Sequence, residues 1–399
     1  MPESLTNIML KEKIKELAKK DTDEFIGIRH HLHAHPELSY HEFETSKYVQ
    51  QKLKEYGVDF EIMAKTGVIG IIQGKNPGKK VIALRADMDA LPILEKNNVS
   101  YRSQNEGVMH ACGHDVHTTC LLGAAKILSK LKEEWEGTIK LVFQPGEEKN
   151  PGGASLLIKE GVLENPKPDA IFALHVHPNL EVGRLSFRGG MVMASADELY
   201  ITVKGKGGHA AAPHLTTDTI VAASQLVVNL QQLVSRMNNP FNPSVLSITS
   251  FQGGNTTNVI PSEVKLMGTF RAMNEDWRFK AHELIKNICA ETGKIYGAKI
   301  DVEIDVGYPF LVNNIELTEK AKRKVAEFVG EANVEETEMR MGAEDFAFYS
   351  HRVPACFFRL GVGNIKKNIT SGVHTPTFDI DEHAIEQGMG VMAWLAVSM

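Results

Sequence analysis

Residues 79–87 read KKVIALRAD, and the same nearly continuous apolar character returns in IKLVFQP at 139–145 and AIFALHV at 170–176. Short apolar runs of this kind are typical of strands that are buried on both faces of a sheet. Helical patterns at about 11–20, 43–56 and 117–132 alternate with these runs. The alternation predicts an α/β domain with a mainly parallel, doubly wound sheet, and it places the active site beyond the carboxyl ends of the strands.

From about residue 197 the order of patterns changes to strand, helix, strand, strand, helix, strand. The segments are ELYITVKGK, TDTIVAASQLVVNLQQLVSRM, SVLSITSF, EVKLMGTFRAM, DWRFKAHELIKNICAETGKIYG and KIDVEIDVG. This β-α-β-β-α-β order is that of a ferredoxin-like unit. A chain of 399 residues also exceeds the usual size of a single core. We therefore predict a catalytic domain made of residues 1–192 and 308–399, with a small domain of residues 193–307 inserted into it.

The overall composition excludes several classes of partner. With 43% hydrophobic residues, 24% charged residues and a formal net charge of -6, the chain is an ordinary globular protein with no expected affinity for nucleic acid. No run approaches the roughly 20 apolar residues of a membrane span, and the charged segment at 1–20 lacks a signal-peptide core. We expect a cytoplasmic protein without a membrane partner. The four cysteines form no CxxC pair, so free thiols are expected.

The motif MHACGHDVHTT at 109–119 places Cys112, His114 and His117 within six positions. Thiolate and imidazole groups suit zinc, and in some sites manganese, cobalt or nickel. The motif therefore indicates a metal site. A buried cysteine near hydrogen-bonded histidines is the alternative interpretation of the same residues.

The motif QPGEEKN at 144–150 places Glu147 and Glu148 directly after a strand-like run. In a turn, one carboxylate can bind a metal while its neighbour takes a proton from water, which is the division of labour that hydrolysis requires. A solvated surface pair is the alternative. His175 and His177 end another apolar run, where one of them suffices as a ligand, and His374 lies in a loop before the last helical segment.

Ten motifs, spread over nearly the whole chain, occur in the same order as in a known protein family. They are RHHLHAHPELSYHEFETSKYV, ALRADMDALPI, MHACGHDVHTT, FQPGEE, LHVHP, GKGGHAAAPH, TTNVIPSEV, GTFRAM, GAEDFAF and GVHTPTFDIDE. Together they resemble the M20 metallopeptidase superfamily, in particular its amidohydrolase branch of aminoacylases, hippurate hydrolases and indole-acetyl-amino-acid hydrolases. The resemblance implies a dinuclear metallohydrolase domain with an inserted lid and dimerisation domain. It also implies hydrolysis of the amide bond of N-acyl amino acids, which releases a carboxylic acid and a free amino acid.

The resemblance further implies a set of site residues. Two divalent ions per subunit, zinc or manganese with cobalt or nickel as alternatives, would be held by Cys112, His114, Glu148, His175 and His374. Glu147 would be the general base, and His209 would stabilise the tetrahedral oxyanion. Asn258 and Arg271 would hold the substrate carboxylate, which suits an arginine fork. From the residues alone, the preferred interpretation of Arg271 is an exposed charge on a strand, and that of Asn258 is a turn residue.

Two features depart from the simplest metal-site reading. The H-x-D metal-binding motif of the wider superfamily is absent, and ALRADMDALP stands in its place. Asp87 is then a candidate for orienting a metal ligand. A helix-cap or turn role for Asp87 or Asp89 fits the sequence equally. The histidine tract RHHLHAHPE resembles a metal site by composition. It matches a part of the family signature that does not ligate metal, so we predict packing and polar roles for its histidines, namely His30, His31, His33 and His35.

Two other functions compete with the amidohydrolase hypothesis. A dipeptidase or carboxypeptidase of the same superfamily would use the same centre, because a peptide is itself an N-acylated amino acid. A non-catalytic metal-binding scaffold is the remote alternative, and the presence of Glu147 argues against it. The resemblance also implies a homodimer formed through the small domain, and whether His209 acts in its own subunit or in its neighbour is left open.

Overall fold

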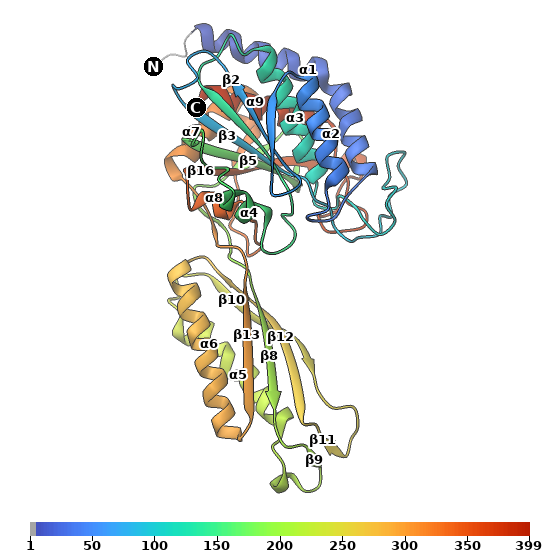
Figure 1. The fold of residues 1–399 in the computed structure, drawn as a ribbon, viewed down its shortest axis with the longest axis vertical. Coiled ribbons are helices and arrows are strands. Elements are labelled where there is room, and N and C mark those ends of the chain that lie inside the picture. The colour runs from blue at the N-terminus through green and yellow to red at the C-terminus, as the bar shows by residue number, and fades with distance from the viewer. Residues whose placement is uncertain (1–4) are drawn as a thin grey trace. The chain divides into compact units, whose positions relative to one another are not determined.

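The computed structural model describes residues 5–399, so residues 1–4 of the charged opening segment lie outside it. The chain forms two compact units, shown in Figure 1. Within the described residues, unit 1 comprises residues 5–190, 312–338 and 348–399, and unit 2 comprises residues 191–311 and 339–347. Two short strands lie where the chain passes between the units, β7 (Gly190–Met193) and β14 (Leu311–Asn313).

Unit 1 is built on an eight-stranded sheet with the order β1-β2-β4-β3-β5-β16-β6-β15. The strands are β1 (Asp59–Met63), β2 (Gly67–Gln73), β3 (Val81–Asp87), β4 (Thr138–Gln144), β5 (Ala170–Glu181), β6 (Leu185–Phe187), β15 (Val334–Glu336) and β16 (Ala355–Gly363). The central strands β4, β3, β5 and β16 are mutually parallel, whereas β1 and β2 form an antiparallel hairpin on the β4 side. The mainly parallel α/β sheet predicted from the sequence is confirmed.

The central strands carry apolar residues on both faces because both faces are covered. All seven residues of β4 and all nine of β16 are buried, as are six of the seven in β3. A parallel sheet covered on both sides has no solvent face, so its strands show no polar alternation. This explains why these runs were recognisable in the sequence as short, nearly continuous apolar stretches.

The helices of unit 1 are α1 (Leu5–Ala34), α2 (Phe43–Glu55), α3 (His114–Lys130), α4 (Gly153–Lys159), α7 (Ile315–Val329), α8 (Ala347–Ser350) and α9 (His383–Ser398), with 3₁₀ turns at Glu331–Asn333 and Ile365–Lys367. Helices α1, α3 and α9 pack on one another (Figure 1). Helix α1 is much longer than the pattern at 11–20 indicates. It continues because no proline interrupts the chain before Pro36, and it therefore includes most of the histidine tract.

Unit 2 has a four-stranded antiparallel sheet with the order β10-β12-β8-β13. Its elements are β8 (Asp197–Lys204), β9 (Gly208–His209), a 3₁₀ turn at Pro213–Leu215, α5 (Thr219–Gln232), a π-helical turn at Leu233–Met237, β10 (Ser244–Gln252), β11 (Val259–Ile260), β12 (Glu263–Ala272), α6 (Glu275–Tyr296) and β13 (Lys299–Val306). Numbered along the chain, the four strands lie in the spatial order 4-1-3-2, which is the ferredoxin-like arrangement. Helices α5 and α6 share one core with the sheet (Figure 1).

The local sequence explains the ends and the faces of these elements. Asp218 and Asn274 cap the N-termini of α5 and α6 by accepting backbone N–H bonds, and Gly297 ends α6 in the left-handed conformation. Strand β8 alternates between buried and exposed residues because only one face of this sheet is covered. None of the helices within residues 5–399 is long and apolar enough to cross a membrane.

Candidate active site

Four of the five candidate metal ligands, and the candidate base Glu147, come from three neighbouring places at the carboxyl ends of the central strands. Glu147 and Glu148 follow β4 in a turn, His175 lies on β5, and Cys112 and His114 lie at the start of α3. Helix α3 begins at His114 because Gly113 takes a left-handed conformation (φ 84°) directly before it. The parallel strands β4, β3 and β5 run side by side, and His175 lies two residues beyond the part of β5 that pairs with β3, so it converges with the residues that follow β4.

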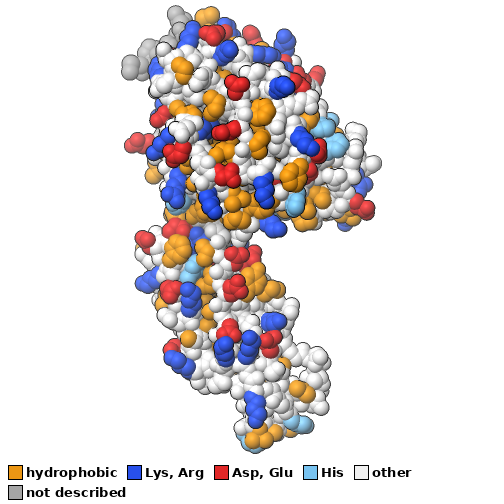
Figure 2. All heavy atoms as spheres, viewed as in Figure 1, with side chains coloured by type: hydrophobic (Ala, Val, Ile, Leu, Met, Phe, Trp, Pro, Cys, Tyr) orange, Lys and Arg blue, Asp and Glu red, His pale blue; other side chains and the backbone are white. Residues whose placement is uncertain are grey.

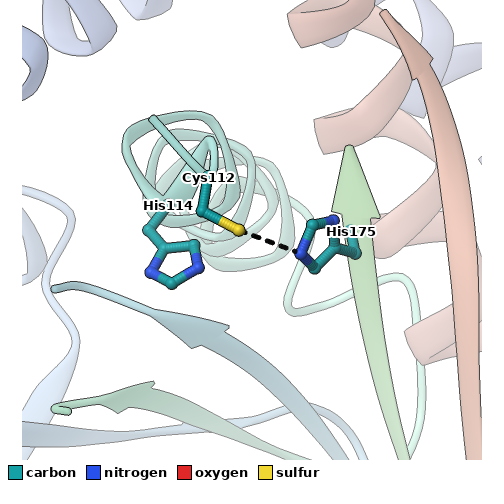
Figure 3. A group of neighbouring side chains, drawn as sticks. All are labelled: Cys112, His114 and His175. Carbon is teal, nitrogen blue, oxygen red and sulfur yellow. Dashed lines mark hydrogen bonds between the residues drawn. The ribbon is translucent and has the colours of Figure 1, made fainter. Parts of the chain in front are cut away.

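Three of these side chains form a buried group, Cys112, His114 and His175 (Figure 3). Their ligand atoms lie within 4.8 Å of one another, and Cys112 Sγ is 3.5 Å from His175 Nε2. His175 Nδ1 donates to the carbonyl oxygen of Val176 at 2.7 Å. This bond places the ring proton on Nδ1, so the lone pair of Nε2 faces the sulfur.

Glu148 and His374 extend the same group. Their ligand atoms lie within 4.8 Å of Cys112 Sγ and of each other, and His374 Nε2 is 3.2 Å from Glu148 Oε1. The backbone N–H of His374 donates to the carbonyl oxygen of Ala111 at 2.7 Å, which ties this distant loop to the residue beside Cys112. The structure thus brings together all five predicted metal ligands.

Asp89 connects a candidate ligand to the candidate base. Its carboxylate faces His114 Nδ1 at 3.2 Å, and it accepts the backbone N–H groups of Glu147 at 3.0 Å and Glu148 at 2.9 Å. The hydroxyl of Ser39 donates to it as well, at 2.6 Å. With Nδ1 of His114 held in this way, Nε2 is the ring nitrogen left to bind a metal.

The turn that carries Glu147 is held by a second carboxylate, Glu42. The backbone N–H of Gly146 donates to Glu42 Oε1 at 2.8 Å, and the Thr66 hydroxyl donates to Oε2 at 2.8 Å. Gly146 has a φ of 54°, and a Cβ on it would lie 2.2 Å from a ring carbon of Tyr40. Only glycine fits this position. Burial, and next the charge of Asp89, raises the pKa of Glu42 to about 7.

The sequence named Asp87 as the candidate for orienting a ligand, with a cap or turn role for Asp87 or Asp89 as the alternative. In the structure Asp89 is the carboxylate at Nδ1 of His114, and the contacts of Asp87 differ. Asp87 accepts from His117 Nδ1 at 2.6 Å and from Arg85 at 2.6 Å. His117 Nε2 in turn accepts the backbone N–H of Val176 at 2.9 Å. Both nitrogens of His117 are therefore used within the protein, although Asp87, His114 and His117 are close enough to form a further ligand group.

A buried network behind the site was not predicted. Asp115, next to His114, accepts from Arg29 Nε at 2.8 Å and lies 2.8 Å from His33 Nδ1. The other ring nitrogen of His33 lies 3.2 Å from Glu95. This network anchors the start of α3 to α1. The sequence signal was the basic tract at 29–33 together with an acidic residue inside MHACGHDVH, but nothing in the sequence pairs them.

The electrostatics of the group fit a divalent cation. His114 Nε2 is buried and has no hydrogen-bond partner among the described residues, and the buried Glu148 Oε1 has His374 Nε2 3.2 Å away. Burial opposes a charge on His114, yet the carboxylates of Asp87, Asp89 and Glu148 outweigh it and raise its pKa to about 10. Burial, and next the charges of Glu148 and Glu147, raises the pKa of the Cys112 thiol well above its usual value. A cation would replace the protons that such groups retain.

The remaining predicted residues lie in unit 2. His209 and Asn258 are exposed neighbours, because β9 and β11 pair with Val259 opposite His209. His209 Nδ1 accepts the backbone N–H of Ala211 at 3.1 Å, so the ring proton is on Nε2, which can donate outward.

Arg271 is separated from this pair within unit 2. It is partly buried near the other end of β12, and eight residues of strand, roughly 26 Å, separate it from Glu263 at the His209 end. Arg271 donates to the hydroxyl of Thr269 beside it. The structure therefore brings His209 and Asn258 together but does not bring Arg271 to them within one copy of this unit.

Residues 83–397 match Peptidase family M20/M25/M40. The chain belongs to this family. Two similar relatives within it carry different names. Thermostable carboxypeptidase 2 of Saccharolobus solfataricus is 40% identical over 97% of this chain and 98% of its own length. N-acyl-L-amino acid amidohydrolase of Geobacillus stearothermophilus is 42% identical over 76% of this chain and 82% of its own length.

A solved structure agrees with the family membership. The Bacillus subtilis YXEP protein, described as a dinuclear metal binding peptidase from M20 family, has a TM-score of 0.82 and 34% identity. The match covers 95% of this chain and 98% of that chain. The predicted M20 membership and the predicted fold class are confirmed.

Proposed function

We propose that this chain is a metal-dependent amidohydrolase that cleaves the amide bond of N-acyl amino acids. The observation that carries the proposal is the convergence of buried Cys112, His114 and His175 with partly buried Glu148 and exposed His374, next to a second carboxylate, the buried Glu147. Binding and base functions are then divided between neighbouring side chains, as hydrolysis requires. The name of the Geobacillus relative supports this substrate class.

We assign the five converging residues to holding two divalent ions, zinc or manganese being preferred, with cobalt and nickel as alternatives. When bound, such ions supply Lewis acidity that acidifies water and polarises an amide carbonyl. Glu147 removes a proton from the attacking water and delivers it to the departing amine nitrogen. Asp89 fixes the position of Glu147 through its backbone N–H.

Unit 2 contributes the groups that recognise the rest of the substrate. The outward Nε2–H of His209 is suited to donate to the oxyanion of the tetrahedral intermediate. Asn258 and Arg271 are assigned to the substrate carboxylate, since a partly desolvated guanidinium binds carboxylates well. Their separation within one copy supports a site completed by two copies of this chain.

We therefore propose a homodimer formed through unit 2. Support comes from exposed apolar side chains on two adjacent elements, Val221 and Val228 on α5 and Val245 and Phe251 on β10. Strand β10 is also an edge of its sheet, with backbone groups available for pairing. We further expect no nucleic-acid partner, and Figure 2 shows acidic and basic side chains interspersed over the visible face rather than gathered by sign. The four free cysteines suit the reducing cytoplasm.

A carboxypeptidase or dipeptidase activity is the second candidate function. The name of the Saccharolobus relative favours it, because that protein matches 97% of this chain at 40% identity. The two activities differ only in the acyl half of the substrate, which is a blocked acyl group in one and an aminoacyl group in the other.

The test is hydrolysis of N-acetyl, N-benzoyl and long-chain N-acyl amino acids beside unblocked dipeptides and longer peptides, with Zn²⁺ or Mn²⁺ added. The control is Glu147→Gln, which keeps the size of the side chain but removes the base. Cleavage of blocked amino acids that stops with a chelator and in the variant supports the proposal. Cleavage of free peptides alone establishes the peptidase. If no substrate is cleaved with either metal, the chain is a non-catalytic scaffold.

A further inference from the structure

Two histidines of the tract at the end of α1 lie outside the candidate active site and face one another. His31 lies in the last turn of α1, and His35 is the first residue after the helix. Their ring centroids are 4.6 Å apart, with an angle of 35° between the ring planes. Both residues are exposed, whereas His33 between them is buried in the Arg29–Asp115 network. The three histidines of this turn therefore divide into one buried residue and one exposed pair.

The hydrogen bonds of the pair leave nitrogen lone pairs available. His35 Nδ1 lies 2.7 Å from the carbonyl oxygen of His31, which can only accept, so Nδ1 carries the proton. Nε2 of His35 then carries a lone pair. Among residues 7–399, no hydrogen bond or ion pair occupies a ring nitrogen of His31. Burial, and next the charges of His35 and Lys52, lowers the pKa of His31, which favours the neutral imidazole whose lone pairs can bind a cation.

The surroundings orient the pair and favour a cation. The ring of Tyr48 stacks on His31 at 4.2 Å between centroids, which restricts the rotation of that imidazole. Both histidines line a surface pocket of about 410 Å³ with the carboxylates of Glu37 and Glu44. Glu44 pairs with Lys47 at 2.6 Å, and Glu37 accepts the backbone N–H of Thr45 at 2.8 Å. With neutral histidines, the carboxylates outnumber the single lysine in this pocket.

We propose that His31 and His35 form a separate surface site for a late first-row divalent ion such as Ni²⁺, Cu²⁺ or Zn²⁺. Two histidines at i and i+4 are a recurring arrangement for such ions. The pair supplies two imidazole ligands, water completes the coordination, and the pocket carboxylates add negative charge. The site is exposed and has fewer protein ligands than the buried group, so it exchanges its ion readily. Its existence does not depend on the reaction proposed above.

The experiment is a calorimetric titration of Ni²⁺ into untagged protein already loaded with its buried ions. The variants are His31→Gln and His35→Gln, and the matched control is His41→Gln, an exposed histidine close by in the chain but outside the pair. We expect an additional Ni²⁺ site in the wild-type protein and in the control. Its affinity should fall about tenfold or more in either pair variant, because one of its two imidazole ligands is lost.

Two outcomes overturn the proposal. One is a wild-type protein that binds no Ni²⁺ beyond the buried ions, and the other is an additional site that persists unchanged in both pair variants. Restoration of binding by His31→Cys, which returns a ligand of different chemistry, distinguishes ligand loss from local unfolding. Cu²⁺ electron paramagnetic resonance gives an independent readout, since nitrogen hyperfine structure should disappear in the pair variants. Hydrolytic activity should be the same in all of these variants.

Discussion

Asp89 joins three parts of the site through one carboxylate, since it contacts His114 and the backbone of Glu147 and Glu148. Asp89→Asn keeps the shape but places an amide where N–H groups need an acceptor. We expect metal affinity and kcat to fall by about 10- to 100-fold, as for other groups that orient ligands. Metal content and steady-state kinetics measure this. Ser39→Ala, which removes one donor to Asp89, is the mild control, and wild-type kinetics for Asp89→Asn would refute the role.

Substitution of His117 tests whether this histidine binds metal or only supports the residues around it. Its ring nitrogens bond Asp87 and the N–H of Val176. His117→Ala should leave the metal content unchanged and lower the free energy of unfolding by about 2 kcal/mol, because two buried groups lose their partners. His114→Ala, the matched variant, should lose metal. Elemental analysis and urea denaturation separate the two effects, and a loss of metal from His117→Ala equal to that from His114→Ala would instead make His117 a ligand.

At the scale of elements, the sequence predicted the parallel core and the ferredoxin-like order. Strands buried on both faces read as continuous apolar runs, whereas strands buried on one face alternate between apolar and polar residues. It did not predict the full length of α1 or the start of α3. The histidines of α1 mix buried and exposed positions, and α3 begins at a left-handed glycine that no periodicity reveals. Individual contacts were equally hidden. Asp87 and Asp89 are two residues apart, and only the directions of their side chains determine which one supports His114.

Asp197, the first residue of β8, binds Arg278 and His282 of α6. Burial would raise the pKa of Asp197, but the His282 hydrogen bond and next Arg278 lower it below 3.8. Its stabilisation is thus complete above about pH 4 and is lost as the pH falls through the folded pKa. Asp197→Asn should cost about 3 kcal/mol at pH 7, because the buried guanidinium of Arg278 loses one of its two carboxylate partners and keeps only Glu275, and less at pH 3. Urea denaturation at both pH values measures this. Exposed Asp301→Asn should change little, and a pH-independent difference for Asp197→Asn would contradict the assignment.

For the whole molecule, the position of His209 within unit 2 bears on whether one copy of the chain can form a complete active site. The chain enters unit 2 beside the Asp197 end of β8, whereas His209 follows the Lys204 end, roughly 23 Å further along the strand. We therefore expect His209 to act in the site of a second copy. His209→Ala and Glu147→Ala should each be inactive, and His214→Ala, an exposed neighbour of His209, should be active.

Mixing the two inactive variants distinguishes action in trans from action in cis. If His209 acts in trans, each mixed dimer contains one site with a native Glu147 and a native His209. Random exchange makes half of the dimers mixed, so the activity should return to about a quarter of the wild-type value. If His209 acts in cis, every site still lacks one group and the mixture stays inactive. Sedimentation of the mixture is measured alongside the activity, and we expect it to show dimers. A monomeric mixture that recovers no activity would refute both the homodimer and the shared active site.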